Sequence, residues 1–136
     1  MLKKEKKTNI IFVNDDAIMN LKPGSLSLDR RVAIEIIPEN CVIETYSTSE
    51  HSAIKVIKAM RKYCCCFRVE VDLEGCVFDA SYVLRNPETM EYCDKKHTYT
   101  KIPYPFNSFS EAVCKTALIA VEDFKETFVP TKGETR

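Results

Sequence analysis

A change of hydrophobic period near residue 64 constrains the fold of this chain more than any other feature. Before it, apolar residues recur at the i, i+3, i+4, i+7 spacing of an amphipathic helix: Ala53, Val56, Ile57 and Met60. After it, "FRVEVDL" (67–73) alternates between apolar and charged residues, and "CVFDASYVL" (76–84) returns after the turn "EG". The sequence therefore predicts a helix followed by a β-hairpin that turns Arg68 outward.

Shorter signals place the remaining elements. The segments "NIIFV" (9–13) and "HTYTKI" (97–102) are expected to be strands. The segment "SLDRRVAIEII" (27–37) has helical spacing, with Ser27 able to cap it and Pro38 ending it. The sequences "STSE" (47–50) and "SFSE" (108–111) both fit a capping box at a helix start.

Together these signals predict one α+β domain, an antiparallel β-sheet covered by helices. The domain is expected over residues 9–129. Residues 1–8 form a basic tail that we expect to be disordered, and residues 130–136 a loose C-terminal tail.

Overall charge limits the classes of partner. Lys plus Arg and Asp plus Glu each total 20, so the formal net charge is zero. A groove for DNA or RNA normally needs a basic excess, so nucleic acid is not expected as a partner. No apolar run approaches the roughly 18 residues of a membrane span, so no membrane partner is expected either. We expect a cytoplasmic protein with reduced cysteines.

The seven cysteines invite a metal or redox interpretation: Cys41, Cys64, Cys65, Cys66, Cys76, Cys93 and Cys114. No CxxC pair occurs, and neighbouring cysteines in a strand face opposite ways, so a shared metal ion is disfavoured. "CDKKH" has only the spacing of a half-site. His51 and His97 are the only candidate histidine bases for a nucleophilic thiol. We interpret the cysteines as small apolar residues, with metal binding and catalysis as the lesser alternatives.

No catalytic constellation stands out, so no enzyme, cofactor or metal is predicted. Three glycines cannot build a glycine-rich phosphate loop. An aromatic set with interspersed cations is more suggestive: Tyr82, Arg85, Tyr92, Lys95, Lys96, Tyr99, Lys101, Tyr104 and Phe106. Such sets hold a nucleobase and its phosphates, although they also occur as a core edge with solvated lysines.

Four segments carry a resemblance to a known family. They are "LKPG" with "LDRRVAIEII", "YSTSEHSAIKVIKAM" (46–60), "FRVEV" (67–71) and "AVCKTALIAVED" (112–123). Together they resemble the phage ABA-sandwich domain family over about residues 20 to 124. The chain departs from the family pattern where Ser49 stands for the usual Asp, Ile54 for Trp and Lys115 for Arg.

The resemblance implies an α/β/α sandwich and a function. The family is similar to the Thoeris anti-defence sponges, which bind cyclic ADP-ribose isomers made by TIR-domain enzymes and sequester them without cleavage. Some of these proteins also hold cyclic oligonucleotides, and they assemble as dimers or dimer-based hexamers in the host cytoplasm.

We expect six residues to bind the ligand. Lys115 is expected from its place in the family pattern, and the others are expected from their positions in the predicted elements: Arg61, Arg68, Tyr82 or Tyr99 for stacking on the base, and Asn107. Lys115 would neutralise phosphate without the bidentate fork of an arginine. Its alternative is an exposed lysine on a helix. The alternative function is a small phage protein-interaction module that inhibits or docks on a host protein, and a hydrolase of the signal is a more distant third.

Overall fold

The computed structural model describes residues 10–12, 16–39, 42–63, 65–72, 77–86, 88–89, 99–101 and 106–128. In chain order the elements are β1 (Ile10–Phe12), α1 (Asp16–Met19), α2 (Leu26–Glu35), α3 (Glu50–Ala59), the 3-10 helix η2 (Met60–Tyr63), β2 (Cys65–Asp72), β3 (Val77–Leu84), β4 (Tyr99–Lys101) and α4 (Phe109–Phe128). The α+β class is confirmed. The two expected tails lie outside the described residues.

The strands form one sheet in the order β1-β4-β3-β2. Strands β2 and β3 pair antiparallel along their whole length, from Cys65 opposite Leu84 to Asp72 opposite Val77. The predicted hairpin is therefore confirmed. Strand β4 pairs antiparallel with β3, but β1 joins β4 in parallel, so the sheet is mixed rather than purely antiparallel. A parallel pair needs a long crossover, and the helices and hairpin between β1 and β4 supply it.

One face of the hairpin packs on the core. The inward residues Phe67 and Val69 of β2 contact the core, whereas Arg68 and Glu70 are exposed, as the alternation predicts. Val71 is the exception, because it lies on the inward face yet is 49% exposed. The core therefore leaves the last inward position of β2 uncovered.

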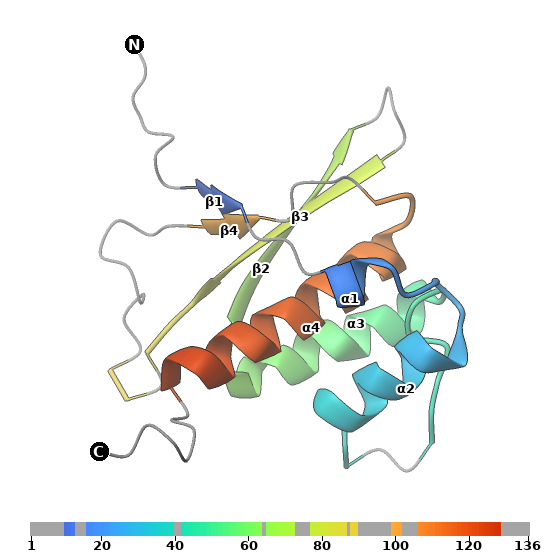
Figure 1. The fold of residues 1–136 in the computed structure, drawn as a ribbon, viewed down its shortest axis with the longest axis horizontal. Helices are drawn as coiled ribbons and strands as arrows, with labels where there is room; N and C mark the ends of the chain where they lie inside the picture. Colours follow the sequence, from blue (N-terminus) through green and yellow to red (C-terminus); the bar gives the residue numbers. More distant parts are fainter. Residues whose placement is uncertain are drawn as a thin grey trace.

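Helix α4 is the centre of the fold. Every residue from Ala112 to Val121 is buried, including Lys115 and Thr116. The helix packs against β3 and β2 on one side and against α1, α2 and α3 on others, so it lies between the sheet and the other helices (Figure 1). A helix enclosed by neighbours in this way is buried around its whole circumference rather than along one apolar stripe.

The helix starts correct two expected caps. Ser25, not Ser27, caps α2 and accepts a hydrogen bond from the Leu28 amide. Ser49, not Ser47, caps α3 in the same way, with the Ser52 amide as donor. Each helix begins two residues away from the expected position because another serine of the same segment takes the capping geometry.

The capping box predicted at the start of α4 forms only in part. The Ser108 hydroxyl accepts from the Glu111 amide at 3.1 Å. The Glu111 carboxylate, however, accepts from Lys115 one turn further along α4.

Among the described helices none is long and apolar enough to cross a membrane.

Candidate functional site

A buried hydrogen-bond network joins three segments that are far apart in the sequence. The Asp29 carboxylate accepts from the Ser47 amide at 2.9 Å and from the Ser47 hydroxyl at 2.7 Å. The same hydroxyl oxygen accepts from the Gly24 amide at 2.7 Å. Asp29 is 4% exposed and Ser47 is fully buried, so these bonds replace water for both side chains. We call these three residues the buried polar cluster.

Backbone geometry explains why a glycine stands in the cluster. Gly24 has φ of 82°, in the left-handed region that L residues with a side chain rarely adopt. A Cβ at this position would also lie 3.1 Å from Cγ2 of Thr48. The turn before α2 can therefore approach the start of α3 closely only with glycine at residue 24.

Cys114 of α4 lies beside this cluster. Burial, and to a lesser degree the Asp29 carboxylate, raise the pKa of the Cys114 thiol far above its usual range. A thiol that stays protonated at neutral pH is a poor nucleophile and a poor metal ligand. Cys114 therefore acts as a small apolar core residue, which agrees with the interpretation made from the sequence.

Lys115 is buried and its ammonium group is engaged within the protein. It is 3% exposed, and Nζ donates to the Met19 carbonyl and to the Glu111 carboxylate, both at 2.8 Å. The alternative interpretation of an exposed lysine is wrong. In this arrangement the ammonium ties α4 to the end of α1 and faces away from solvent.

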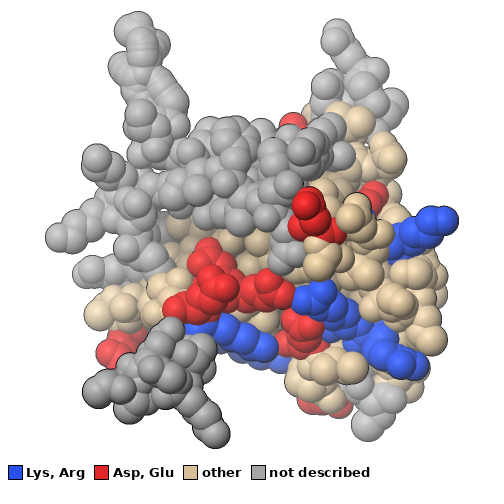
Figure 2. Space-filling model, in the orientation of Figure 1, with Lys and Arg blue, Asp and Glu red and all other residues tan. Residues whose placement is uncertain are grey.

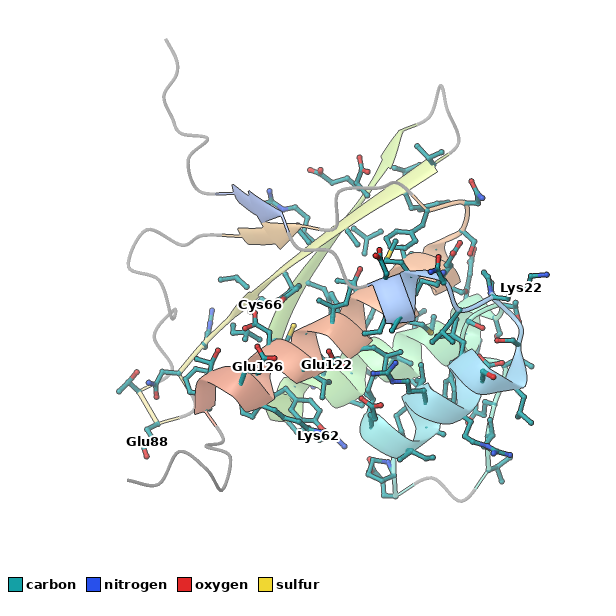
Figure 3. The ribbon with its side chains drawn as sticks, in the orientation of Figure 1. Lys22, Lys62, Cys66, Glu88, Glu122 and Glu126 are labelled. Carbon is teal, nitrogen blue, oxygen red and sulfur yellow. The ribbon has the colours of Figure 1, made fainter. Side chains whose placement is uncertain are left out.

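Further polar contacts hold α4 to its neighbours. Arg31 of α2 donates to Glu122 of α4 at 2.6 Å and to Glu35 of its own helix at 2.7 Å. On the face shown in Figure 2, acidic side chains gather near the middle and basic side chains lie beside them. Glu122 and Glu126 follow one another along α4 (Figure 3).

The six predicted ligand residues are in different settings. Arg61, in η2, is exposed, as are Arg68 on the outer face of β2 and Asn107 just before α4. Tyr82 is 1% exposed, and its hydroxyl donates to Asp123 of α4 at 2.8 Å. Tyr99 lies in β4, but its side chain is outside the described residues.

The structure does not bring these residues together within one subunit. Arg68 is paired in register with Ser81, so Tyr82 points to the opposite face of the sheet. The Tyr82 ring is packed in the core, so we correct its expected role to a structural one. Arg61 and Asn107 lie near opposite ends of β3, which are about 20 Å apart for a strand of this length.

The clustered cysteines form no metal site in the described part of the chain. No group of three or more His, Cys, Asp or Glu side chains there could hold a metal ion. Cys65 and Cys66 are half-buried and are the first two residues of β2, two residues after the end of η2. Figure 3 labels Cys66. The change from helix to strand that the sequence predicts near residue 64 is confirmed.

One sequence signal for the buried polar cluster is the position of Asp29, which lies among apolar residues on one face of α2. Asp29 shares the i, i+3, i+4, i+7 spacing with Val32, Ala33 and Ile36, so it lies on the apolar face of α2. A carboxylate on such a face requires internal donors. The structure supplies them from Ser47, which the spacing alone does not single out.

Comparison with known proteins gives no neighbour. No protein-family model matches the chain, and neither a curated protein nor a solved structure shows significant similarity to it.

Proposed function

We propose that this protein is a phage anti-defence sponge that binds a cyclic ADP-ribose isomer made by TIR-domain enzymes and sequesters it without cleavage. The proposal starts from the resemblance to the phage ABA-sandwich family. It includes that family's single-domain α/β/α sandwich, to which the described elements contribute a sheet and the helices packed beneath it.

The observation that carries the proposal is the buried polar cluster. The Pro-Gly turn, the Leu-Asp helix and the Tyr-Ser-Thr helix start are three of the segments on which the resemblance rests. Gly24, Asp29 and Ser47 represent one segment each, and direct hydrogen bonds connect them. Residues that a family shares for a structural reason are expected to meet in this way, so the resemblance has a physical basis in this chain.

The exposed cations are the best candidates to contact a pyrophosphate. Arg61 and Arg68 are accessible and can donate in a bidentate manner, whereas Lys115 is committed to Glu111 and Met19. Because Arg61 and Asn107 lie far apart in one subunit, a pocket that uses both would cross a subunit boundary. The proposal therefore includes a homo-oligomer built from dimers.

Calorimetric titration with cyclic ADP-ribose isomers and with cyclic oligonucleotides tests this function. We expect tight binding, and after heat denaturation chromatography should recover the ligand chemically unchanged. Arg61→Ala and Arg68→Ala should each weaken binding by roughly tenfold or more, since each removes a charge-assisted contact. Arg30→Ala, which removes an exposed arginine from α2, is the matched control and should bind like the wild type.

Three other outcomes are informative. An altered ligand after release would show an enzyme and contradict sequestration. Unchanged binding in both arginine variants would refute their role, although not the function. Absence of binding to every cyclic nucleotide would overturn the proposal.

A second function, a module that docks on a host protein, has one observation in its favour. Several large apolar side chains of the helical side are more than 40% exposed: Leu26, Ile34, Val42, Ile43 and Ile54. Exposed apolar groups favour a protein interface when they form one patch. Affinity capture from host lysate, repeated with Ile34→Lys and Ile54→Lys, tests this alternative. A partner retained by the wild type and lost in both variants would favour it.

A further inference from the structure

Strand β2 ends the described sheet. In the strand order β1-β4-β3-β2 it has a strand neighbour, β3, on one side only within the part of the chain that the structure describes. The strand is eight residues long, from Cys65 to Asp72. The edge of such a strand presents a row of backbone amides and carbonyls that can pair with another strand.

The side chains of β2 have a pattern that is complementary to itself. On the outer face Arg68 and Glu70 are exposed and lie two positions apart, with opposite charges. On the inner face Val71 is 49% exposed although its neighbours on that face pack on the core. Val71 is thus an exposed apolar residue near the end of an otherwise covered face, and Phe67 lies four residues before it on the same face.

We propose that β2 pairs antiparallel with β2 of a second copy of this chain, around a two-fold axis at Val69. In this register Arg68 of each copy lies opposite Glu70 of the other, and Phe67 lies opposite Val71. The two sheets become one continuous sheet with the α4 helices on the same side. Each copy offers the same surface, which is the self-complementary contact of a two-fold dimer.

Charge selects this register among the alternatives. Antiparallel pairing that keeps both core faces on one side requires a two-fold axis that passes through a residue of β2. An axis at Arg68 or at Glu70 places like charges opposite each other, and an axis at Val71 places Glu70 opposite Asp72. An axis at Phe67 leaves Arg68 opposite Cys66. An axis at Glu70 also places Arg68 opposite Asp72, but only the axis at Val69 forms two opposite-charge pairs, which stabilise a sheet, without placing like charges opposite each other.

The inference specifies a surface for the homo-oligomer of the proposed function, but it rests on β2 alone. A sponge could bind its ligand through another assembly, and a β2 dimer could form in a protein that binds no nucleotide. Failure of the dimer and failure of ligand binding are therefore separate results.

Charge exchange at the two outer positions provides the test. The mass of the wild type, measured by light scattering and sedimentation over a wide range of concentrations, should be that of a dimer that dissociates on dilution. Arg68→Glu and Glu70→Arg each convert the two attractive pairs to repulsive ones and should weaken the dimer by roughly tenfold or more. The double variant Arg68→Glu with Glu70→Arg restores both pairs and should dimerise like the wild type. Glu126→Arg makes the same charge change at an exposed position of α4 and serves as the control.

A second measurement keeps the proposal testable if a single variant folds poorly. Amide hydrogen exchange in β2 of the wild type should slow as protein concentration rises, while exchange in α2 should not change. A wild type that stays monomeric throughout, or a dimer that both single reversals leave intact, overturns the proposal. A dimer without concentration-dependent protection of β2 does so as well.

Discussion

The helical side of this molecule and its edge strand treat polar side chains in opposite ways. Around α4, Asp29, Ser47 and Lys115 are almost fully buried, and each makes two or more hydrogen bonds inside the protein. On β2, Arg68 and Glu70 face solvent. Polar residues of the first region therefore hold the helices to one another, whereas those of the second lie at the protein surface.

The largest expected effect is that of Asp29→Ala. This variant leaves the buried amide and hydroxyl of Ser47 without their acceptor, and we expect it to lower the free energy of unfolding by about 3 kcal/mol. Asp29→Asn keeps one acceptor oxygen and should lose less. Urea unfolding followed by circular dichroism measures both. Glu70→Ala on β2 is the comparison and should lie within about 0.5 kcal/mol of the wild type. Equal losses of unfolding free energy in Asp29→Ala and Glu70→Ala would contradict the difference between the two regions.

Lys115→Met tests whether the buried ammonium matters for stability. The variant keeps the apolar stem but leaves Glu111 without its cation, and we expect a loss of about 2 kcal/mol in urea unfolding. The double variant Lys115→Met with Glu111→Gln should regain most of that loss, because it removes the remaining charge. Arg68→Met is the matched change on the edge strand and should be nearly neutral in dilute solution. If Lys115→Met is also neutral, the ion pair has no structural role.

Alkaline pH should reveal the setting of Cys114. The pKa of the Cys114 thiol is raised in the folded protein. In the unfolded chain the thiol ionises above a pKa of about 8.5, whereas in the folded protein it stays protonated. The free energy of unfolding is therefore unaffected by this group below that pH and decreases as the pH rises above it. The decrease for this one group approaches 1.4 kcal/mol per pH unit. The free energy of unfolding of Cys114→Ala should therefore fall less steeply between pH 9 and 10 than that of the wild type. Parallel pH profiles would contradict the burial of this thiol.

The smallest expected effect separates the two serines at the start of α2. Ser25→Ala removes the observed cap and should cost about 1 kcal/mol, because the Leu28 amide loses its acceptor. Ser27→Ala, at the exposed position that the sequence suggested, should change stability by less than about 0.3 kcal/mol. Thermal unfolding of the two variants measures the difference. A larger loss of stability in Ser27→Ala than in Ser25→Ala would identify Ser27 as the cap.

The sequence predicted the hairpin well because strict alternation leaves one register that buries Phe67 and Val69 together. It also predicted the strands near residues 10 and 100 and all three long helices. It did not predict α1, a helix of four residues from Asp16 to Met19, since so short a segment carries no periodicity.

Candidate ligand residues could not be placed by the same reasoning. Periodicity states which residues share a face, but not which neighbour covers that face. Tyr82 and Lys115 were considered for a ligand because of their chemistry, yet Asp123 and Glu111, each on α4, are their partners in the fold. Such tertiary pairs depend on how distant elements pack, which local patterns do not encode.

The enclosure of α4 has a consequence for how the chain reaches its native state. The sheet and the helices α1 to α3 all precede Phe109 in the sequence, and all pack on the helix that begins there. During synthesis these elements leave the ribosome before the helix that fills the space between them. The elements before Phe109 therefore lack their common packing partner until α4 has been synthesised, so we expect the last helix to complete the folding of the domain.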